Sequence, residues 1–279
     1  MTPPAPTSPQ GYVLLYDKPA GITSHDVVAS IRRQLPRGTK VGHAGTLDPF
    51  ATGLLLILVG RATRAQRFLL ALRKSYEAVA RFGAVSSTGD PEGEIVTTGV
   101  VPAGELELPV GKVRQRPPAY SAVKVDGRRA YSRARAGEQF DLPEREVFVH
   151  RFEERWRDGE RRAFVIDCSS GTYVRSLISA LGDAYCERLR RTAIGDFLVA
   201  DADPGRPVSL SRALSFMPAV ELASEDATRV AHGARVPATD ADLAARSDVT
   251  VRLVDAEGLI AIAEPADGGR TWHPVVGLR

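Results

Sequence analysis

Short apolar runs and alternating segments predict strands in the first two hundred residues of the chain. Residues 12–16 and 54–59 are apolar or aromatic runs bounded by turn residues, which is typical of strands. Residues 74–82 alternate between apolar and polar positions, as a strand with one buried face does. Residues 163–168 predict a further strand before a turn at 169–171.

Helical spacing appears twice between these strands. Ser24 is a suitable N-cap for an amphipathic helix that stops at Pro36 and Gly38. The apolar positions on one face of this helix are Val27, Val28, Ile31 and Leu35. Residues 173–185 predict a second helix. Because strands occur in groups with helices between them, the predicted fold class is α+β.

The pattern changes near residues 201–220, where Asp, Pro and Gly interrupt it. Beyond this boundary, residues 249–254 and 259–263 predict two short strands joined through Glu257-Gly258 in a hairpin. We therefore expect one large domain over residues 11–210 and a small, mostly β module over residues 221–279. The Pro-rich residues 1–10 are expected to form a disordered tail.

Composition narrows the class of protein. With 43% hydrophobic and 25% charged residues, the chain is expected to fold around a packed core. Its longest apolar run, residues 54–59, is far shorter than the roughly 20 residues that cross a bilayer, so no membrane association is expected. Cys168 and Cys186 form neither a disulfide framework nor a metal-ligand cluster, which indicates a reducing cytoplasm and no metal site.

The distribution of charge is more informative than the net charge of +3. Residues 112–135 contain eight basic residues and one acid, whereas residues 221–279 contain six arginines and ten acids. The first stretch favours a polyanionic partner such as RNA, although a solvated arginine-rich face is an equal alternative on charge alone. The tyrosines that lie among cationic residues, and so could stack on bases, are Tyr76, Tyr120, Tyr131 and Tyr173.

Residues 42–53, GHAGTLDPFATG, are the segment most suggestive of chemistry. Asp48 before Pro49 suits a helix N-cap, but the apolar run that follows predicts a strand and leaves no clear helix to cap. Asp48 is therefore either a cap or a functional carboxylate on a glycine-containing loop. His43 lies five residues earlier and has no second metal ligand near it, so a zinc site is not expected.

Arg175 occupies an unusual position. It falls in the first turn of its predicted helix, where the positive end of the helix dipole disfavours a cation. A carboxylate partner would compensate for this placement. Asp48 is one candidate among many, because distance along the sequence does not distinguish them.

Five ordered segments resemble those of a known family. They are residues 17–24 (DKPAGITS), 42–49 (GHAGTLDP), 74–78 (KSYEA), 117–124 (PPAYSAVK) and 171–175 (GTYVR). Their order and spacing resemble the bacterial tRNA pseudouridine-55 synthase family of the TruB type, over roughly residues 11–200. The resemblance implies a mixed, mainly antiparallel catalytic domain and a cofactor-free isomerase that converts uridine 55 in the TΨC loop of tRNA to pseudouridine.

The resemblance also assigns roles to individual residues. Asp48 matches the catalytic aspartate, Tyr76 the tyrosine that stacks on the target base, and Arg175 the arginine that pairs with the aspartate. The remaining matches are Tyr173 and Leu189 in the walls of the uracil pocket, His43 as an RNA contact, and Lys18 in a segment that supports the active-site loop. It further implies an RNA-clasping insertion at about residues 124–151 and a PUA-like C-terminal module in a cytoplasmic, monomeric protein.

Three other functions compete with this one. A glycosidase normally uses two carboxylates, and no second acid lies in a comparable motif. A tRNA-binding or tRNA-folding protein would keep the RNA clamp without the chemistry, but Asp48, Tyr76 and Arg175 are all present. A guide-RNA-dependent relative is less favoured, because the chain lacks long basic tails.

Overall fold

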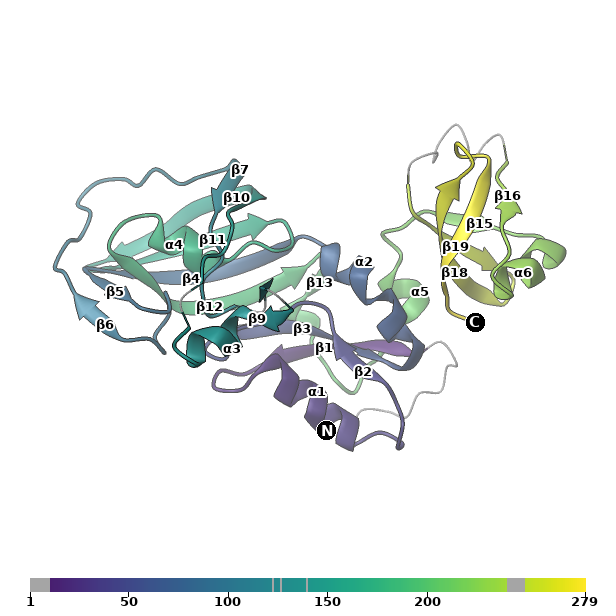
Figure 1. Ribbon diagram of the computed structural model, residues 1–279, viewed down its shortest axis with the longest axis horizontal. Coiled ribbons are helices and arrows are strands. Elements are labelled where there is room, and N and C mark those ends of the chain that lie inside the picture. Colours follow the sequence, from purple (N-terminus) through teal and green to yellow (C-terminus); the bar gives the residue numbers. More distant parts are fainter. Residues whose placement is uncertain (1–10, 122, 126, 139, 240–248) are drawn as a thin grey trace.

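The computed structural model describes residues 11–121, 123–125, 127–138, 140–239 and 249–279, so the predicted tail lies outside the described residues. Two sheets, one large and one small, form most of the fold (Figure 1). The large sheet contains β1 (Tyr12–Lys18), β2 (Val41–His43), β3 (Thr52–Val59), β4 (Lys74–Phe82), β7 (Gly111–Gln115), β10 (Arg145–Asp158), β11 (Arg161–Cys168), β12 (Ala184–Ile194), β13 (Phe197–Leu198) and β14 (Val208–Ser209). The small sheet contains β15 (Ala219–Glu221), β16 (Val236–Pro237), β17 (Val251–Asp255), β18 (Gly258–Ala266) and β19 (Thr271–Gly277).

The helices and two hairpins are shorter elements around these sheets. The helices are α1 (Ser24–Arg33), η1 (Gly60–Ala65), α2 (Gln66–Ala71), α3 (Ala130–Arg135), α4 (Val174–Ser179), η2 (Val199–Asp201), α5 (Leu210–Ala213) and α6 (Ser224–Ala231). The hairpins pair β5 (Ala84–Ser86) with β6 (Ile95–Thr97) and β8 (Lys124–Val125) with β9 (Arg128–Arg129). Within the described residues, no helix is long and apolar enough to span a bilayer.

The large sheet runs in the order β14-β1-β3-β12-β4-β11-β10-β7, with β2 beside β3 and β13 beside β12. Every pairing in it is antiparallel except one: β3 and β12 run parallel and share only the partners Thr52–Arg190 and Gly53–Arg191. We call this junction the β3–β12 seam. The predicted α+β class with a mixed, mainly antiparallel sheet is confirmed.

Strand β3 explains why its sequence is a continuous apolar run. Successive side chains of a strand point to opposite faces. Leu54, Leu56 and Leu58 enter one core cluster, whereas Leu55 and Ile57 enter another. Both faces of this strand are therefore buried, as in strands covered on both sides.

Helix α1 covers one of those faces, but its N-cap differs from the prediction. Thr23 is the N-cap: its hydroxyl accepts the amide of Asp26, and the Asp26 carboxylate accepts the amide of Thr23. Ser24 is instead the first helical residue. Its hydroxyl accepts the amide of Leu47 at 2.8 Å and donates to the Leu47 carbonyl at 3.1 Å. The residue predicted as a cap therefore fastens α1 to the loop that carries Asp48.

A further prediction of secondary structure needs correction. The predicted helix over residues 173–185 is only the six-residue α4, and residues from Ala184 onward form β12 in the middle of the sheet. Gly182, at a φ of +134°, follows the helix. Register shifts at 186/188 and 191/193 break the alternation of β12, which hides it in the sequence. Residues 41–43, at the start of the glycine-containing segment that carries Asp48, form the short strand β2.

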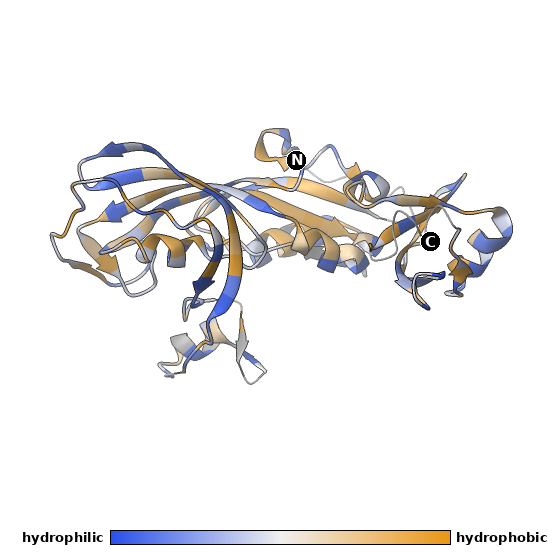
Figure 2. Ribbon diagram, turned by 90° about the horizontal axis from the view of Figure 1, so that it is seen from above, coloured by the Kyte–Doolittle hydropathy of each residue, from blue (hydrophilic) through white to orange (hydrophobic). Residues whose placement is uncertain are grey.

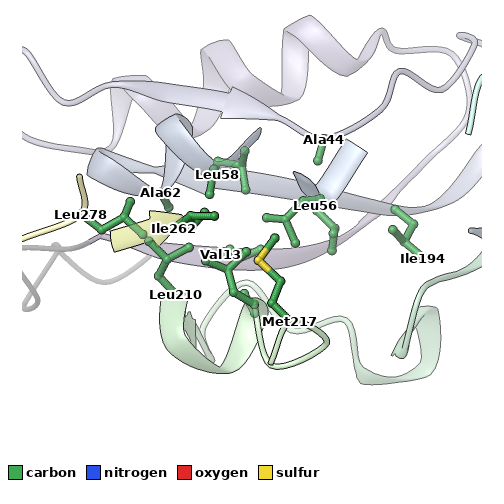
Figure 3. Close-up of a cluster of buried hydrophobic side chains, with 14 of the residues drawn as sticks. Val13, Ala44, Leu56, Leu58, Ala62, Ile194, Leu210, Met217, Ile262 and Leu278 are labelled. Carbon is green, nitrogen blue, oxygen red and sulfur yellow. The ribbon is translucent and has the colours of Figure 1, made fainter. Parts of the chain in front are cut away.

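The small sheet packs against the large one. Its predicted hairpin is present, with Asp255 opposite Gly258. Ile262 and Leu278 belong to the same buried cluster as Val13 and Leu56 of the large sheet (Figure 3). The C-terminal sheet therefore completes a core that the N-terminal strands begin.

The segment predicted to clasp RNA, at about residues 124–151, contains β8, β9, α3 and the first part of β10. The two views together show β8, β9 and α3 as a small lobe that projects from the large sheet (Figures 1 and 2). Strand β10 then returns the chain to the sheet between β7 and β11.

Candidate active site

Asp48 lies on the loop that joins β2 to β3, and no helix starts there. The Asp48 carbonyl accepts the amide of Ala51 in a turn, at 3.1 Å. Leu47, the residue before it, is buried and fixed by Ser24. The helix-cap interpretation of Asp48 is therefore wrong, and the loop presents its carboxylate instead.

Lys18 holds the other side of this loop. It is fully buried at the end of β1, and its ammonium group donates to the carbonyls of Pro19 (2.8 Å), Ile22 (2.8 Å) and Pro49 (3.2 Å). Burial lowers the pKa of Lys18 to about 8, against the opposing effect of nearby Asp48. Lys18 therefore supports the residue that directly follows Asp48, but it does not line the pocket described below.

Arg175 is the partner of Asp48. Its Nε lies 2.9 Å from Oδ2 of Asp48, although the two residues are far apart in the sequence. The Arg175 side chain is 3% exposed, whereas 26% of the Asp48 side chain remains open to solvent. The helix position of Arg175 predicted a carboxylate partner. Asp48, one of the candidates named from the sequence, is such a partner.

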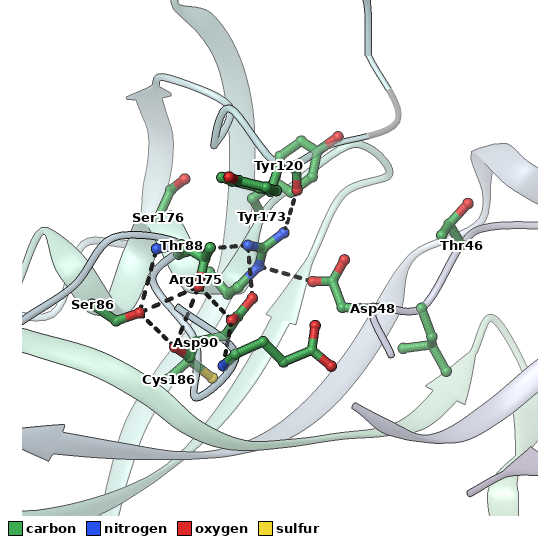
Figure 4. A network of polar contacts seen from close by, with 12 residues as sticks. Thr46, Asp48, Ser86, Thr88, Asp90, Tyr120, Tyr173, Arg175, Ser176 and Cys186 are labelled. Carbon is green, nitrogen blue, oxygen red and sulfur yellow. Dashed lines mark hydrogen bonds and ion pairs between the residues drawn. The ribbon is translucent and has the colours of Figure 1, made fainter. Parts of the chain in front are cut away.

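A second carboxylate, which sequence analysis missed, binds the same guanidinium (Figure 4). Oδ2 of Asp90 accepts from Nη1 of Arg175 at 2.9 Å, and the other Arg175 amino group donates to the Tyr120 carbonyl at 2.8 Å. Oδ1 of Asp90 accepts the Thr88 hydroxyl and the amide of Glu92. Arg175 is therefore locked between two acids, of which only Asp48 faces the pocket.

Asp90 left only a faint signal in the sequence. Thr88-Gly89-Asp90 is turn chemistry between two short strands, and such residues are common in turns for local reasons. Nothing local indicates that its carboxylate reaches an arginine 85 positions later.

A pocket of about 240 Å³ opens beside Asp48. Tyr76 of β4, Leu189 of β12 and Tyr173 at the start of α4 contribute to its wall together with Asp48 and Arg175. Two larger pockets, of about 460 and 630 Å³, do not include Asp48 in their linings. The structure thus brings five of the seven predicted site residues together around one pocket.

The aromatic walls of this pocket are held in place. Tyr76 is buried on the inner face of β4, and burial raises the pKa of its hydroxyl while the positive charge of Arg191 acts in the opposite direction. The guanidinium of Arg145 lies 4.7 Å from the ring centroid of Tyr173, a cation–π distance. Both rings therefore have fixed orientations before any ligand enters.

The Asp48 carboxyl is electrostatically unusual. Burial is the main effect and raises its pKa above the ordinary value of 3.8, and the nearby Asp90 carboxylate raises it further. Arg175 and Lys18 act in the opposite direction without cancelling this shift. A perturbed pKa, a rigid cationic partner and access to a pocket are features expected of a catalytic carboxylate.

The remaining predicted positions lie elsewhere. His43 is half-buried on β2, where its carbonyl accepts the Gln66 side chain, and it does not line the pocket. Cys168 and Cys186 are buried, and burial raises the pKa of Cys168 to about 11, so these thiols stay protonated in the core. In the part of the chain that the structure describes, no group of three metal-ligating side chains occurs.

Comparison with known proteins agrees with this geometry. The family model described as TruB family pseudouridylate synthase, N-terminal domain, matches residues 32–174. The tRNA pseudouridine synthase B of Thermobifida fusca is 43% identical over 254 aligned residues, which cover 80% of this chain and 86% of the relative. The chain belongs to the TruB family of pseudouridylate synthases.

Other relatives extend the match to almost the whole chain. The tRNA pseudouridine synthase B of an Arthrobacter species is 37% identical, with 95% of each chain covered. The chain also aligns with a chain in a crystal structure of a Cbf5-Nop10-Gar1 complex, with a TM-score of 0.71 and 25% identity. This alignment covers 97% of the present chain and 85% of the other. The similarity therefore includes the C-terminal sheet as well as the large sheet.

Proposed function

We propose that this TruB-family chain isomerises uridine 55 in the TΨC loop of tRNA to pseudouridine, with Asp48, Tyr76 and Arg175 as its catalytic residues. Family membership supports the reaction and the tRNA substrate. The observation that carries the residue roles is the 2.9 Å ion pair between buried Arg175 and the pocket-facing Asp48.

The target base has to leave its stack before Asp48 can reach the sugar. Flipping a base costs a few kcal/mol, and stacking on an aromatic side chain returns about 1–3 kcal/mol. Tyr76 supplies that stacking surface, while Tyr173 and Leu189 enclose the base from other sides. The pocket therefore favours a single, extruded pyrimidine over a base within a helix.

The reaction breaks the C1′–N1 bond, turns the uracil, and forms a C1′–C5 bond with loss of the C5 proton to solvent. It involves no net redox change and is proposed to need neither a cofactor nor a metal. The Asp48 carboxylate attacks the substrate or stabilises the positive charge that develops at C1′. Arg175 keeps that carboxylate ionised and correctly oriented.

RNA binding is proposed to involve His43, the loop supported by Lys18, and the basic lobe at about residues 124–151. Basic side chains near this lobe pair with exposed or half-buried acids, as in Arg128–Glu138 at 2.8 Å and Lys112–Glu146 at 3.1 Å. Exposed ion pairs contribute little to stability, so phosphates can replace these acids. We further propose that residues 11–210 form the catalytic domain, that residues 221–279 form a PUA-like module, and that the protein acts as a cytoplasmic monomer.

Tritium release from tRNA labelled at uracil C5 tests the reaction directly. The wild-type protein should release tritium from tRNA but not from a tRNA that lacks only the target uridine. Asp48→Asn should release none, while its affinity for tRNA stays within a few fold of wild type. Binding without release by the wild type would instead support a tRNA-binding or tRNA-folding protein, and release by Asp48→Asn would remove Asp48 from the mechanism.

A further inference from the structure

Two buried cations in the wall of the Asp48 pocket have no role in the mechanism proposed above. Lys74, at the start of β4, is 5% exposed, and Arg191 of β12 is 1% exposed. Arg175 has two acidic partners, but among the described residues neither Lys74 nor Arg191 forms an ion pair with a carboxylate. Burying a cation without a counter-charge is unfavourable, so the placement calls for an explanation.

Backbone carbonyls fix these two side chains without neutralising them. Arg191 donates to the carbonyl of Leu54 at 2.7 Å and to that of Gly45 at 3.0 Å. Lys74 donates to the carbonyls of Leu70 and Leu72. Carbonyl oxygens orient the ammonium and guanidinium groups, but they supply no negative charge to balance either cation.

Gly45 shows that the two cations are neighbours. A Cβ at this position would lie 3.6 Å from Nη1 of Arg191 and 3.8 Å from Cε of Lys74. Gly45 also has a φ of +105°, a conformation that other residues rarely adopt. Burial, together with repulsion from Arg191, lowers the pKa of Lys74 to about 8. The pocket therefore holds two adjacent cations and no acid between them in the described structure.

The proposed reaction creates the charge that such a pair would attract. When the C1′–N1 bond breaks, both bonding electrons stay on N1, and the resulting anion spreads over the oxygens at C2 and C4 of uracil. Loss of the C2′ proton ejects the same anion, because the C–H electron pair forms a C1′–C2′ double bond as N1 leaves. Attack at C6 breaks the C5–C6 π bond and places the electron pair on the oxygen at C4. Every route thus makes the uracil negative.

We propose that Lys74 and Arg191 stabilise the uracil anion while the base is detached from C1′, an inference that rests on the proposed function. Both line the pocket together with Tyr76, whose buried ring borders the same space. Their carbonyl contacts hold them in place before the anion forms, so little reorganisation accompanies the reaction. Asp48 and Arg175 act on the sugar side, and this pair acts on the base side.

A merely structural role is the competing explanation, since Arg191 also ties the Asp48 loop to β3 through Gly45 and Leu54. The two roles differ in their dependence on the leaving base. An electron-withdrawing fluorine at C5 stabilises the uracil anion by itself, so a 5-fluorouridine substrate depends less on cations in the pocket. A displaced loop would slow both substrates equally.

The experiment compares tRNA stem-loops that carry uridine or 5-fluorouridine at the target position. The variants are Lys74→Gln and Arg191→Gln, which keep a donor but remove the charge, and Lys74→Arg and Arg191→Lys, which keep the charge. Arg190→Gln is the matched control, because this neighbouring arginine pairs with Asp17 at 2.7 Å outside the pocket. Single-turnover loss of the starting nucleoside is followed by nuclease digestion and chromatography, and affinity is measured separately.

Each glutamine variant should slow uridine turnover by about 100-fold, as loss of one preorganised stabiliser does. The loss on 5-fluorouridine should be about tenfold smaller, with affinity nearly unchanged, and the charge-keeping variants and Arg190→Gln should retain the wild-type ratio between the two substrates. Equal losses on both substrates, or no loss on uridine, would overturn the inference. Where one position does not tolerate glutamine, as circular dichroism will reveal, the other position and the charge-keeping variants decide. Inactive wild-type protein would count against the proposed function instead.

Discussion

Replacing Lys18 with methionine removes the ammonium group that holds the Asp48 loop while keeping a long apolar side chain in the same space. Three carbonyls lose this donor, but that of Pro49 also accepts the amide of Gly21 at 2.9 Å and stays satisfied. The carbonyls of Pro19 and Ile22 are left without the Lys18 donor, and an unsatisfied buried acceptor costs about 1–3 kcal/mol. We expect the free energy of unfolding to fall by about 2–6 kcal/mol, toward the lower end because Pro19 is exposed and water can reach its carbonyl.

The same change should impair turnover more than binding. Pro49 follows Asp48 directly, and a displacement of about 1 Å in a reacting group costs on the order of 100-fold in rate. Single-turnover tritium release and urea denaturation measure the two effects in one protein preparation. Lys40→Met is the control, because Lys40 is exposed and its side chain should contribute less than about 0.5 kcal/mol. Wild-type stability and wild-type rate in Lys18→Met would show that the loop does not depend on this lysine.

Three further predictions follow from the same geometry. Asp90→Asn should lower the single-turnover rate by about tenfold or more with little change in tRNA affinity, because Arg175 then orients Asp48 without its second anchor; an unchanged rate would refute this. In the proposed mechanism Asp48 acts as a carboxylate, and its pKa lies above the ordinary value of 3.8, so the rate should rise with pH through a midpoint above that value, and Asp90→Asn should move this midpoint down by removing a like charge. Gly53→Ala should unfold at markedly lower urea concentration, since its Cβ would overlap the backbone of Arg191 at a φ of +106°, whereas Gly38→Ala, at a φ of +89° with nothing within 4 Å, should cost only about 1 kcal/mol.

Local sequence patterns predicted those elements whose environment is uniform along their length. Strand β4 alternates cleanly because one face is buried, and its predicted bounds are those observed. Strand β12 escaped prediction because two register shifts disturb its alternation and because residues 173–185 carry helical spacing at their start. Strand β2, three residues long, is defined by its pairing with β3 and has little pattern of its own.

The residues of the candidate site likewise differ in how far local sequence could predict them. Asp48 and Arg175 each carried a local anomaly, an aspartate with no helix to cap and a cation at a helix start, and these anomalies were informative. Asp90 resembled an ordinary turn residue, because its ion-pair partner, Arg175, is 85 positions away in the sequence. The charges of Lys74 and Arg191 were visible in the sequence, but their shared burial beside Gly45 depends on the folded sheet. Family resemblance supplied roles that local physics alone left open.

The β3–β12 seam has a consequence for synthesis of the protein on the ribosome. Strand β3, with its run of leucines, and the Asp48 loop emerge early, but their only β12 partners, Arg190 and Arg191, emerge more than 130 residues later. Until then β2 covers only the Ile57–Val59 end of that edge of β3, and the start of this apolar strand lacks its neighbour, the kind of surface that promotes aggregation and engages chaperones. The carboxylate, its arginine and the pocket wall likewise meet only when nearly the whole large sheet has left the ribosome. A nascent or truncated chain that ends before β12 lacks Leu189 and Arg191 of the pocket wall and should therefore be unable to modify RNA.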